Sequence, residues 1–322
     1  MRFPLAVTAT LAAACSLLSQ STVSANPIDS ELPGYRPSDN IAGQVSLVGS
    51  STMSNVAGIW TDSFQHYHPQ TKLPIAAPGS RAAVDAVING QATFGLLSRS
   101  ITQDEAARFN KTFGYNPTVL DCCYEHIAIY VHEKNTIPSL TLEQVRDIFS
   151  GKATKWGDVG ATGQWASQPI ITHGRGSTTG SRVFMQQTLL RGTKHVVTQE
   201  HESNRDLVSA VGSMKEARGI GYAGLIYKLP GVRAVPIAHN KDTAPVAIDS
   251  LAAARGGYAI MRPLQLVVNQ PPNKRLPAEA AEFLKYVFSH SGQEDVVKSG
   301  FQPISAAPAR MALDATGLGT AR

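Results

Sequence analysis

The sequence predicts an α/β fold with mostly parallel strands, and three features of the 322-residue chain carry this prediction. Short runs of β-branched and aliphatic residues alternate with stretches whose apolar residues recur at helical spacing. Hydrophobic residues make up 43% of the chain and charged residues 16%, which is enough apolar material for one large or two ordinary domains. The sequence has no internal repeat and no low-complexity linker, so two domains would follow each other without a flexible spacer.

Short aliphatic or β-branched runs close to Gly, Ser or Pro have the character of buried strands in a covered sheet. These runs are residues 45–48, 73–76, 94–97, 127–131, 169–172 and 266–268. Helical patterns follow several of them, with apolar faces that begin at Met53 and at Val84. A capping-box pattern at Thr141 and Gln144 predicts the start of a further helix, which Gly151 ends.

The N-terminal segment has the pattern of an export signal. Arg2 gives it a positive start, residues 5–18 are apolar, and residues 23–25 have the small side chains that a signal peptidase recognises. The apolar stretch is too short to span a bilayer comfortably. We therefore expect a signal peptide over residues 1–25, cleavage near Ala25, and a periplasmic or secreted protein. An alternative interpretation makes Cys15 a lipid-modified N-terminus, because small residues precede it.

Charge and cysteine content exclude several classes of protein. The chain has 29 Lys and Arg against 24 Asp and Glu, a net charge of +5, but no basic run, so we expect no nucleic-acid partner. This modest balance suits a small anionic ligand, or has no bearing on any partner. The adjacent Cys122 and Cys123 are either two buried thiols or a strained vicinal disulfide. Since the histidines are scattered, we expect neither a metal nor a cofactor.

Three turns between a strand and a helix combine Gly with Ser or Thr. Their sequences are GSST at 49–52, PGSR at 78–81 and HGRGSTTGSR at 173–182. A helix N-terminus presents unpaired N–H groups and the positive end of the helix dipole, and hydroxyls add further donors. Ser and Thr also cap helices for stability alone, which is the alternative explanation for any single turn. The three turns together, one with Arg175 and Arg182, indicate an anion site.

The third turn fits neither of two enzyme motifs. Gly176 and Gly180 enclose three residues, whereas a nucleotide-binding P-loop has four and then a Lys. The residue midway between them is Thr178, whereas a nucleophile elbow has Ser at that place. We therefore expect a binding protein and not an enzyme.

Motifs along nearly the whole mature chain resemble those of the periplasmic phosphate-binding receptors of ABC-type phosphate importers. They are GSST at 49–52, GS at 79–80, FGLLSR at 94–99, LTLEQVRDIFSG at 140–151, KWGDVG at 155–160, Arg175 with TGS at 179–181, GIGY at 219–222 and GQ at 292–293. Any one of these motifs alone is weak, but their order and spacing are specific to this family.

The resemblance implies a two-lobed type II periplasmic binding protein, with a mixed, mostly parallel sheet in each lobe and two hinge crossings, at residues 127–131 and 260–268. Lobe one would combine residues 26–130 with 262–322, and lobe two would be residues 131–261. The protein would be a monomer that binds inorganic phosphate, or another tetrahedral oxyanion, between the lobes. It would deliver this ligand to the membrane permease of an ABC importer.

The resemblance also implies the ligand contacts. Lobe one would contribute Ser51, Thr52, Ser80 and Ser98, and lobe two would contribute Arg175, Thr179, Gly180 and Ser181. The guanidinium of Arg175 would form a bidentate, charge-assisted clamp, and the other residues would donate neutral hydrogen bonds. Fixed dipoles can replace the hydration shell of an oxyanion without a full countercharge.

Two positions depart from the best-known phosphate receptors. Those receptors have an Asp after the Ser aligned with Ser98, which accepts the ligand's proton and so rejects sulfate, whereas this chain has Arg99. Since many relatives share Ser-Arg here, phosphate stays the expected ligand, and Arg99 is free to form a salt bridge on the rim. Ser177 stands where an Asp often orients the clamping Arg. Two alternatives stay open: an exported phosphatase, although the sequence lacks a two-metal cluster, and a surface or sensor relative that has lost its ligand.

Overall fold

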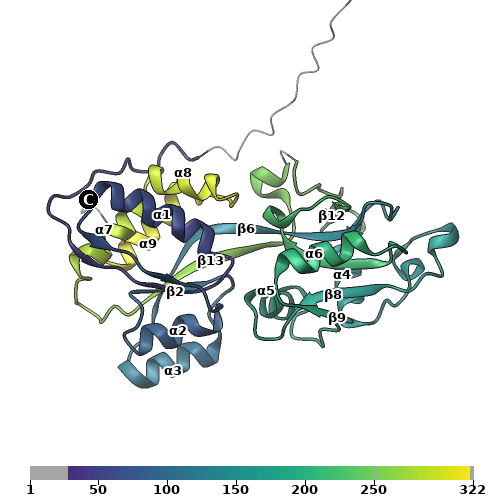
Figure 1. Cartoon of the computed structure of the whole chain (residues 1–322), viewed down its shortest axis with the longest axis horizontal. Helices are drawn as coiled ribbons and strands as arrows, with labels where there is room; N and C mark the ends of the chain where they lie inside the picture. Colours follow the sequence, from purple (N-terminus) through teal and green to yellow (C-terminus); the bar gives the residue numbers. More distant parts are fainter. Residues whose placement is uncertain (1–27, 251, 320–322) are drawn as a thin grey trace, which may run out of the picture.

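The computed structural model describes residues 28–250 and 252–319, so the expected signal peptide, its cleavage site and Cys15 lie outside the described residues. The chain forms two lobes joined by two strands, β6 (Thr118–His132) and β13 (Met261–Val268), which run side by side between them (Figure 1). The antiparallel strand pairs involve β6 or β13, and the other pairs are parallel. The predicted mixed, mostly parallel α/β fold is confirmed.

Lobe one is built from both ends of the chain. Its strands are β1 (Gly43–Gln44), β2 (Leu47–Gly49), β3 (Thr71–Lys72), β4 (Ile75–Ala76) and β5 (Phe94–Leu97), and its helices are α1 (Ser54–Tyr67), α2 (Arg81–Ile88), α3 (Gln103–Phe113), α7 (Ala278–Val287), α8 (His290–Lys298) and α9 (Ala306–Ala315). The sheet order β4-β2-β5-β13-β6 places its middle strands between two helical layers. In Figure 1, α1, α7, α8 and α9 lie on one side of this sheet, and α2 and α3 lie on the other.

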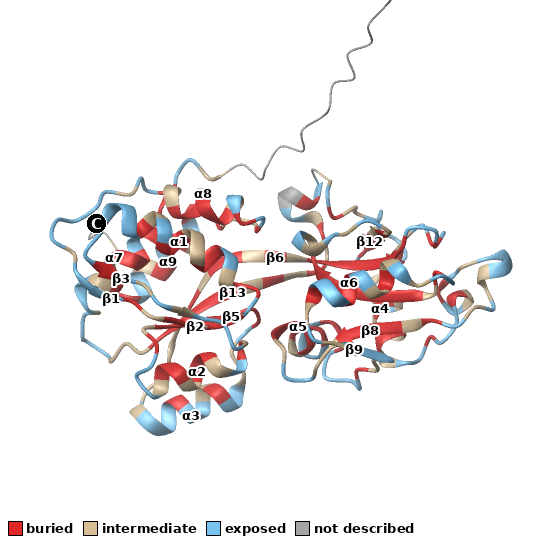
Figure 2. Ribbon diagram, viewed as in Figure 1, coloured by how far each residue is buried: buried red, intermediate tan, exposed pale blue. Residues whose placement is uncertain are grey.

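Each side of the lobe-one sheet has its own apolar core. On the side of α1 and α7, Trp60, Phe64 and Phe283 are fully buried, and the indole nitrogen of Trp60 donates to Gly292 O at 2.8 Å. On the side of α2 and α3, Val84 and Phe109 pack in a smaller cluster. The buried faces of these helices point at the sheet in Figure 2, as the helical spacing of their apolar residues predicts.

Lobe two continues the same sheet beyond β6. Its strands are β7 (Leu140–Thr141), β8 (Ile171–Arg175), β9 (Gln199–His201), β10 (Gly219–Gly224), β11 (Val232–Ala234) and β12 (Ile237–Ala238), its α-helices are α4 (Leu142–Ser150), α5 (Gly180–Phe184) and α6 (Asn204–Ser213), and it has short 3₁₀ or π turns at Trp156–Val159, Gly163–Trp165, Met185–Leu189, Leu225–Tyr227 and Ala253–Gly257. The predicted capping box is present at the start of α4, where Thr141 Oγ1 accepts from Gln144 N and the Gln144 side chain accepts from Thr141 N. Gly151 ends this helix in a left-handed conformation, with φ 82°.

One strand belongs to both lobes. Residues Thr118–His126 of β6 pair with β13 in lobe one, and residues Ile127–Val131 pair with β10 in lobe two. The segment 127–131, expected as a crossing at the edge of lobe one, therefore lies in the lobe-two sheet, and β6 changes lobes between His126 and Ile127. The composition marks 127–131 as an apolar run, but it does not show where the strand changes lobes, because the change depends on which strand lies alongside.

Several strand boundaries also differ from the sequence prediction. The segment 94–97 matches β5, but the run at 45–48 forms a ladder only from Leu47, and the run at 169–172 corresponds to β8 at Ile171–Arg175. Val45 is fully buried, which explains its apolar character. It lies between β1 and β2, and its N–H donates to Lys72 O of β3. The apolar composition of a segment predicts that it is buried. It does not predict which residues form a strand ladder, because pairing depends on residues far away in the sequence.

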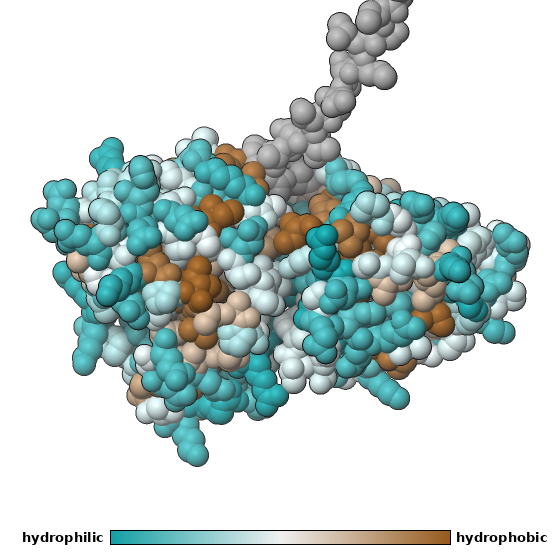
Figure 3. Space-filling model, viewed as in Figure 1, coloured by the Kyte–Doolittle hydropathy of each residue, from teal (hydrophilic) through white to brown (hydrophobic). Residues whose placement is uncertain are grey.

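The two cysteines lie inside β6 as free, fully buried thiols, which confirms that alternative against the vicinal disulfide. Cys122 Sγ donates to Leu264 O at 3.0 Å, across the ladder to β13. The surface seen in Figure 3 is mostly hydrophilic, with hydrophobic residues in small separate groups. Among the described helices, none is long and apolar enough to cross a membrane.

Candidate functional site

A cavity of about 340 Å³ lies between the lobes, and all three Gly- and hydroxyl-containing turns line it. The structure brings all the expected ligand contacts together around this cavity: Ser51, Thr52, Ser80, Ser98, Arg175, Thr179, Gly180 and Ser181. Ser50, Arg81, Asp85 and Thr178 also line it and were not among the expected ligand contacts. We call this space the anion cavity.

On the lobe-one side, the hydroxyl groups do not cap the helices. The residues before α1 and α2, Met53 and Ser80, make no side-chain capping bond in the part of the chain that the structure describes. Ser80 Oγ instead accepts from Ser98 N at 3.2 Å and lies 3.2 Å from Ser98 Oγ. Within the first turn, Ser50 Oγ accepts from Thr52 N at 3.2 Å. Capping of α1 and α2 does not explain the hydroxyls of Ser51, Thr52 and Ser80, which line the anion cavity beside helix starts that carry no side-chain cap.

The lobes touch at Gly180, the first residue of α5. A Cβ atom at this position would lie 2.4 Å from Ser98 Oγ and 2.9 Å from Ser80 Oγ. Because any side chain at this position would clash with the two hydroxyls, only glycine allows the start of α5 to lie so close to Ser80 and Ser98. The cleft is therefore narrow at this point, and Ser80, Ser98 and Ser181 are each at most 4% exposed.

Lobe two contributes the third turn, between β8 and α5. Thr179 caps α5, since its Oγ1 accepts from Arg182 N at 3.4 Å. Capping thus accounts for one hydroxyl of the third turn, as the alternative explanation allowed, while Ser181 stays beside the cavity. The chain continues from α5 directly into the π turn at Met185–Leu189.

Arg175, at the end of β8, is held by the segment that follows the parallel strand β9. Its Nε donates to His201 O at 3.1 Å, its Nη2 to Glu202 O at 2.7 Å and its Nη1 to Asn204 Oδ1 at 2.9 Å. Of the five N–H donors of a guanidinium, these three bonds leave one on each terminal nitrogen for a ligand. Burial lowers the pKa of Arg175, but the group stays charged at neutral pH.

Asn204 is the residue that sequence reasoning missed. Its Oδ1 accepts from Arg175, as the family resemblance expects of an Asp at the position of Ser177. Asn204 is the first residue of α6, 29 positions after Arg175 in the sequence. The pairing of Arg175 with His201 across β8 and β9 brings this segment alongside. No local pattern in the sequence predicts that register.

Arg99 does not reach the rim of the cleft. It is 3% exposed and forms a bidentate ion pair with Glu105, with Nη2 to Oε1 at 2.7 Å and Nη1 to Oε2 at 2.8 Å. The Glu105 side chain also accepts from Thr102 N, which completes the capping box of α3. Burial opposes the ionised form of Glu105, but its bonds to Arg99 and Thr102 outweigh this and lower its pKa. The expected salt bridge is present, but it is buried inside lobe one.

Two other residues near the third turn point away from the anion cavity. Arg182 donates to His195 O at 3.0 Å and lies 3.6 Å from Glu200. His173 is fully buried, its Nδ1 lies 3.0 Å from His201 Nε2, and the two rings stack. Burial, and the neighbouring His201 to a lesser extent, lower the pKa of His173 to about 4, so its ring is neutral at neutral pH. In residues 28–250 and 252–319, no group of three or more His, Cys, Asp or Glu could hold a metal ion.

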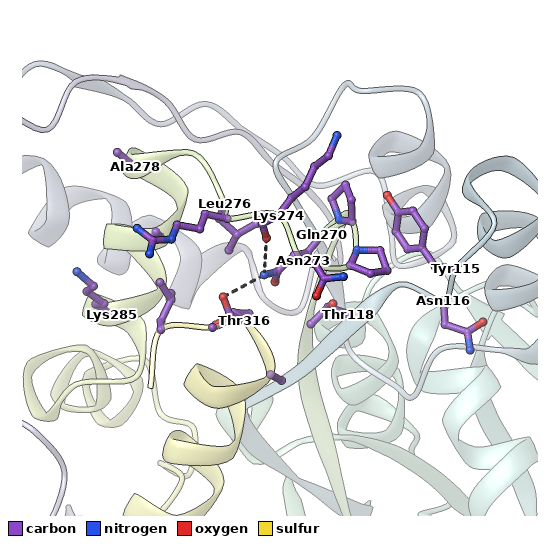
Figure 4. A pocket seen from close by; sticks show the side chains of 17 residues that line it. Tyr115, Asn116, Thr118, Gln270, Asn273, Lys274, Leu276, Ala278, Lys285 and Thr316 are labelled. Atoms are coloured by element: carbon purple, nitrogen blue, oxygen red, sulfur yellow. Dashed lines mark hydrogen bonds between the residues drawn. The ribbon is translucent and has the colours of Figure 1, made fainter. Parts of the chain in front are cut away.

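A larger cavity, of about 1100 Å³, lies within lobe one alone and is lined partly by residues 270–276 (Figure 4). Gln270 sits at its centre and donates to Thr316 O at 3.0 Å and to Lys274 O at 3.4 Å. Lys274 and Arg275 are exposed to solvent. This cavity lacks the converging helix N-termini and the half-buried guanidinium of the anion cavity, so it is not the candidate site.

Comparison with known proteins identifies the family of the chain. A family profile described as "PBP superfamily domain" matches residues 35–291. The phosphate-binding protein PstS of Pseudomonas aeruginosa is 35% identical to this chain over 300 residues, which cover 90% of this chain and 92% of that protein. The phosphate-binding protein PstS of Staphylococcus epidermidis is 26% identical over 262 residues, which cover 79% of this chain and 77% of that protein.

Solved structures share the fold. An ABC-type phosphate transport receptor from Vibrio cholerae superposes with a TM-score of 0.65 at 21% identity, covering 81% of this chain and 100% of that one. PstS from Borrelia burgdorferi superposes with a TM-score of 0.55 at 22% identity, covering 81% and 99%. With the profile match over most of the chain and the 35% identity to a PstS over nearly its full length, the chain belongs to the PBP superfamily and, within it, to the family of PstS-type phosphate-binding proteins.

Proposed function

We propose that this protein is an extracytoplasmic receptor that binds inorganic phosphate in the anion cavity and delivers it to the membrane permease of an ABC importer. The observation that carries the proposal is the convergence of three helix-opening turns and one half-buried Arg on a cavity between two lobes. Similarity to proteins described as phosphate-binding supports phosphate as the ligand. The export pattern of residues 1–25, or the lipid-anchor alternative at Cys15, agrees with a place outside the cytoplasm.

Each side of the anion cavity would bind the ligand differently. From lobe one, Ser51, Thr52, Ser80 and Ser98 would donate hydroxyl or backbone hydrogen bonds, together with the uncapped N-termini of α1 and α2. From lobe two, the two free N–H groups of Arg175 would clamp two oxygens of the anion. Thr179, Gly180 and Ser181 would close around it from the start of α5. Phosphate bound this way would bridge the lobes and stabilise their closed arrangement.

The chemistry of the lining residues favours binding without reaction. Asp85 is the lining residue with a carboxylate, and its side chain is 50% exposed and paired with Arg108 at 3.0 Å. Neither a nucleophile beside a base nor a metal cluster is found among the residues that line the anion cavity. Since Arg99 is paired with Glu105 away from the site, a hydroxyl such as Ser98 would have to accept the ligand's proton. No observation favours the phosphatase alternative.

Calorimetric titration tests the proposal. The mature protein is unfolded and refolded to remove bound ligand, shown to be folded by circular dichroism, and titrated with phosphate and then sulfate at neutral pH. We expect tight binding of phosphate and much weaker binding of sulfate. Equal binding of both ions would make the protein a general carrier of tetrahedral oxyanions. The absence of heat with either ion, from folded protein, would refute the receptor function.

A further inference from the structure

A buried ion pair connects the two strands that cross between the lobes. Glu125 of β6 and Arg262 of β13 face each other in the antiparallel ladder, and Arg262 Nε donates to Glu125 Oε2 at 2.7 Å. Their side chains are 2% and 0% exposed, respectively. We call Glu125 and Arg262 the hinge pair. Taking both charges out of water is costly, and an apolar pair of similar volume would often be at least as stable, so stability alone is a weak reason for this pair.

The hinge pair contacts the anion cavity through Thr52. Arg262 Nη2 donates to Thr52 Oγ1 at 3.3 Å, and Thr52 lines the cavity. A guanidinium can only donate hydrogen bonds, so the Thr52 oxygen must be the acceptor in this contact. The hydroxyl proton of Thr52 must then point in another direction. Since the Thr52 oxygen accepts from Arg262, its hydroxyl proton is oriented so that it can be donated to an anion in the cavity.

The hinge pair also contacts lobe two. The guanidinium carbon of Arg262 lies 6.0 Å from the ring centre of Phe184, in the helix α5 that begins at Gly180. On the other side, a Cβ atom at Gly224 of β10 would lie 1.8 Å from Glu125 Oε1, so the carboxylate is pressed against the lobe-two backbone. The pair therefore sits where lobe one, lobe two and both crossing strands meet.

Two atoms of the pair have unused hydrogen-bonding capacity. Arg262 Nη1 and Glu125 Oε1 are buried and have no hydrogen-bond partner within the described residues. Burial opposes the charged form of Glu125 more strongly than Arg262 favours it, so the pKa of Glu125 is raised. The pair is thus held in place by packing and by its few bonds, one of which goes to a residue of the anion cavity.

We infer that Arg262 is a positioning residue of the phosphate site, which acts through Thr52 and is held in place by Glu125. This inference rests on the proposed function and adds to it a residue outside the lining of the cavity. Arg262 orients the Thr52 hydroxyl so that its proton is donated to the bound anion. Because the same side chain packs on α5, the orientation of Thr52 depends on the closed arrangement of the lobes, and the hydroxyl is aligned when the ligand is enclosed.

A double-mutant cycle tests this coupling. The Thr52→Val variant removes the hydroxyl while keeping the shape of the side chain. The Arg262→Met/Glu125→Leu variant removes both charges together, so that no unpaired charge stays buried. Phosphate Kd values are measured by calorimetry for the wild type, for each of these variants and for the combined triple variant. We expect Thr52→Val to weaken phosphate binding by about tenfold in the wild type and by threefold or less when the hinge pair is absent.

Equal fold-changes for Thr52→Val in both backgrounds would overturn the inference, because a purely structural hinge pair would not alter the contribution of one hydroxyl. If the wild type binds no phosphate, the proposed function itself fails and this inference falls with it. Arg233→Gln is the matched control, since Arg233 donates to the backbone carbonyl of Asn135 in lobe two and lies outside the cavity. Should the hinge-pair variant not fold, the cycle of Thr52→Val with Arg262→Lys decides the question by the same criterion.

Discussion

Replacing Arg175 by Ala should weaken phosphate binding more than any other single change in the anion cavity. The guanidinium is positioned by three bonds to the 201–204 segment and keeps one N–H on each terminal nitrogen for the ligand. A hydrogen bond between charged groups contributes about 1.5–3 kcal/mol. Two such bonds therefore amount to about 3–6 kcal/mol, and since 1.4 kcal/mol corresponds to a tenfold change, Kd should rise by about 10²- to 10⁴-fold.

The same substitution should also lower the stability of the ligand-free protein. Arg175→Ala removes three hydrogen bonds inside lobe two, and we expect a loss of about 1–3 kcal/mol in the free energy of unfolding because water can reach the freed acceptors through the cavity. Titration calorimetry of refolded protein measures Kd, and urea denaturation without phosphate measures stability. Arg175→Lys keeps the charge and should fall between the wild type and Arg175→Ala.

The outcome that would refute this reasoning is simple to recognise. If Arg175→Ala binds phosphate with a Kd within threefold of the wild type, the guanidinium does not contact the ligand, and the anion cavity is not the phosphate site. A loss of affinity that merely matches a loss of folded protein would also fail to support it. For that reason the folded fraction is measured at the temperature of the titration.

Three further changes probe the lobe contact, the buried pair of lobe one and the acid sensitivity of lobe two. Gly180→Ala would place a methyl group against Ser98 Oγ, 2.4 Å away, and should weaken phosphate binding at least tenfold with little change in unfolding free energy, since the open form avoids the clash. Arg99→Met leaves a buried carboxylate unpaired and should cost about 3–5 kcal/mol of stability in urea denaturation, with phosphate Kd changed less than threefold. Burial lowers the pKa of His195 from 6.5 to about 3, so below pH 6.5 the unfolded chain binds a proton that the folded chain does not. The free energy of unfolding should therefore decrease as the pH is lowered, by about 2 kcal/mol between neutral pH and pH 5. His195→Phe should remove this part of the loss.

Each of these changes has its own control or contrary result. Gly176→Ala, in the same turn, is the control for Gly180→Ala, because the nearest atom to its added Cβ is 4.0 Å away. A large rise in phosphate Kd for Arg99→Met would show that Arg99 contributes to phosphate binding. For His195, equal slopes of unfolding free energy against pH in wild type and variant would show that other groups cause the acid sensitivity.

The sequence predicted which turns meet at the cavity, but not the residues that hold their side chains in place. Gly and hydroxyl residues at helix starts are a local signal, because helix N-termini need donors and acceptors within a few residues. That signal identified the turns of Ser51, Ser80 and Thr179, and the structure brings them to one cavity. Asn204 and Arg262 carry no such signal. They lie near the site because strands far apart in the sequence pair in one register, which no pattern within a single segment encodes.

The same limit explains how Arg99 differs from expectation. Its partner Glu105 is only six positions along the chain, yet the sequence could not show that the pair is buried. Burial depends on how α3 packs against α2, with Phe109 in the apolar cluster that α2 shares with the sheet. A charged residue next to a binding Ser looks like part of the site until that packing is known.

The continuity of β6 across both lobes has a mechanical consequence. Its backbone hydrogen bonds pass from β13 to β10 without a loop, so we expect the lobes to open by a twist of the paired strands and not by movement of a loop. We expect this twist to be spread over many peptide units of β6, and the hydrogen bonds between the paired strands to resist a wide opening of the lobes. The amide protons near residues 126 and 127 should then exchange slowly with solvent even while the cavity opens and closes, whereas those of residues 176–178 should exchange fast. Release of the ligand would twist the molecule without unfolding any part of its hinge.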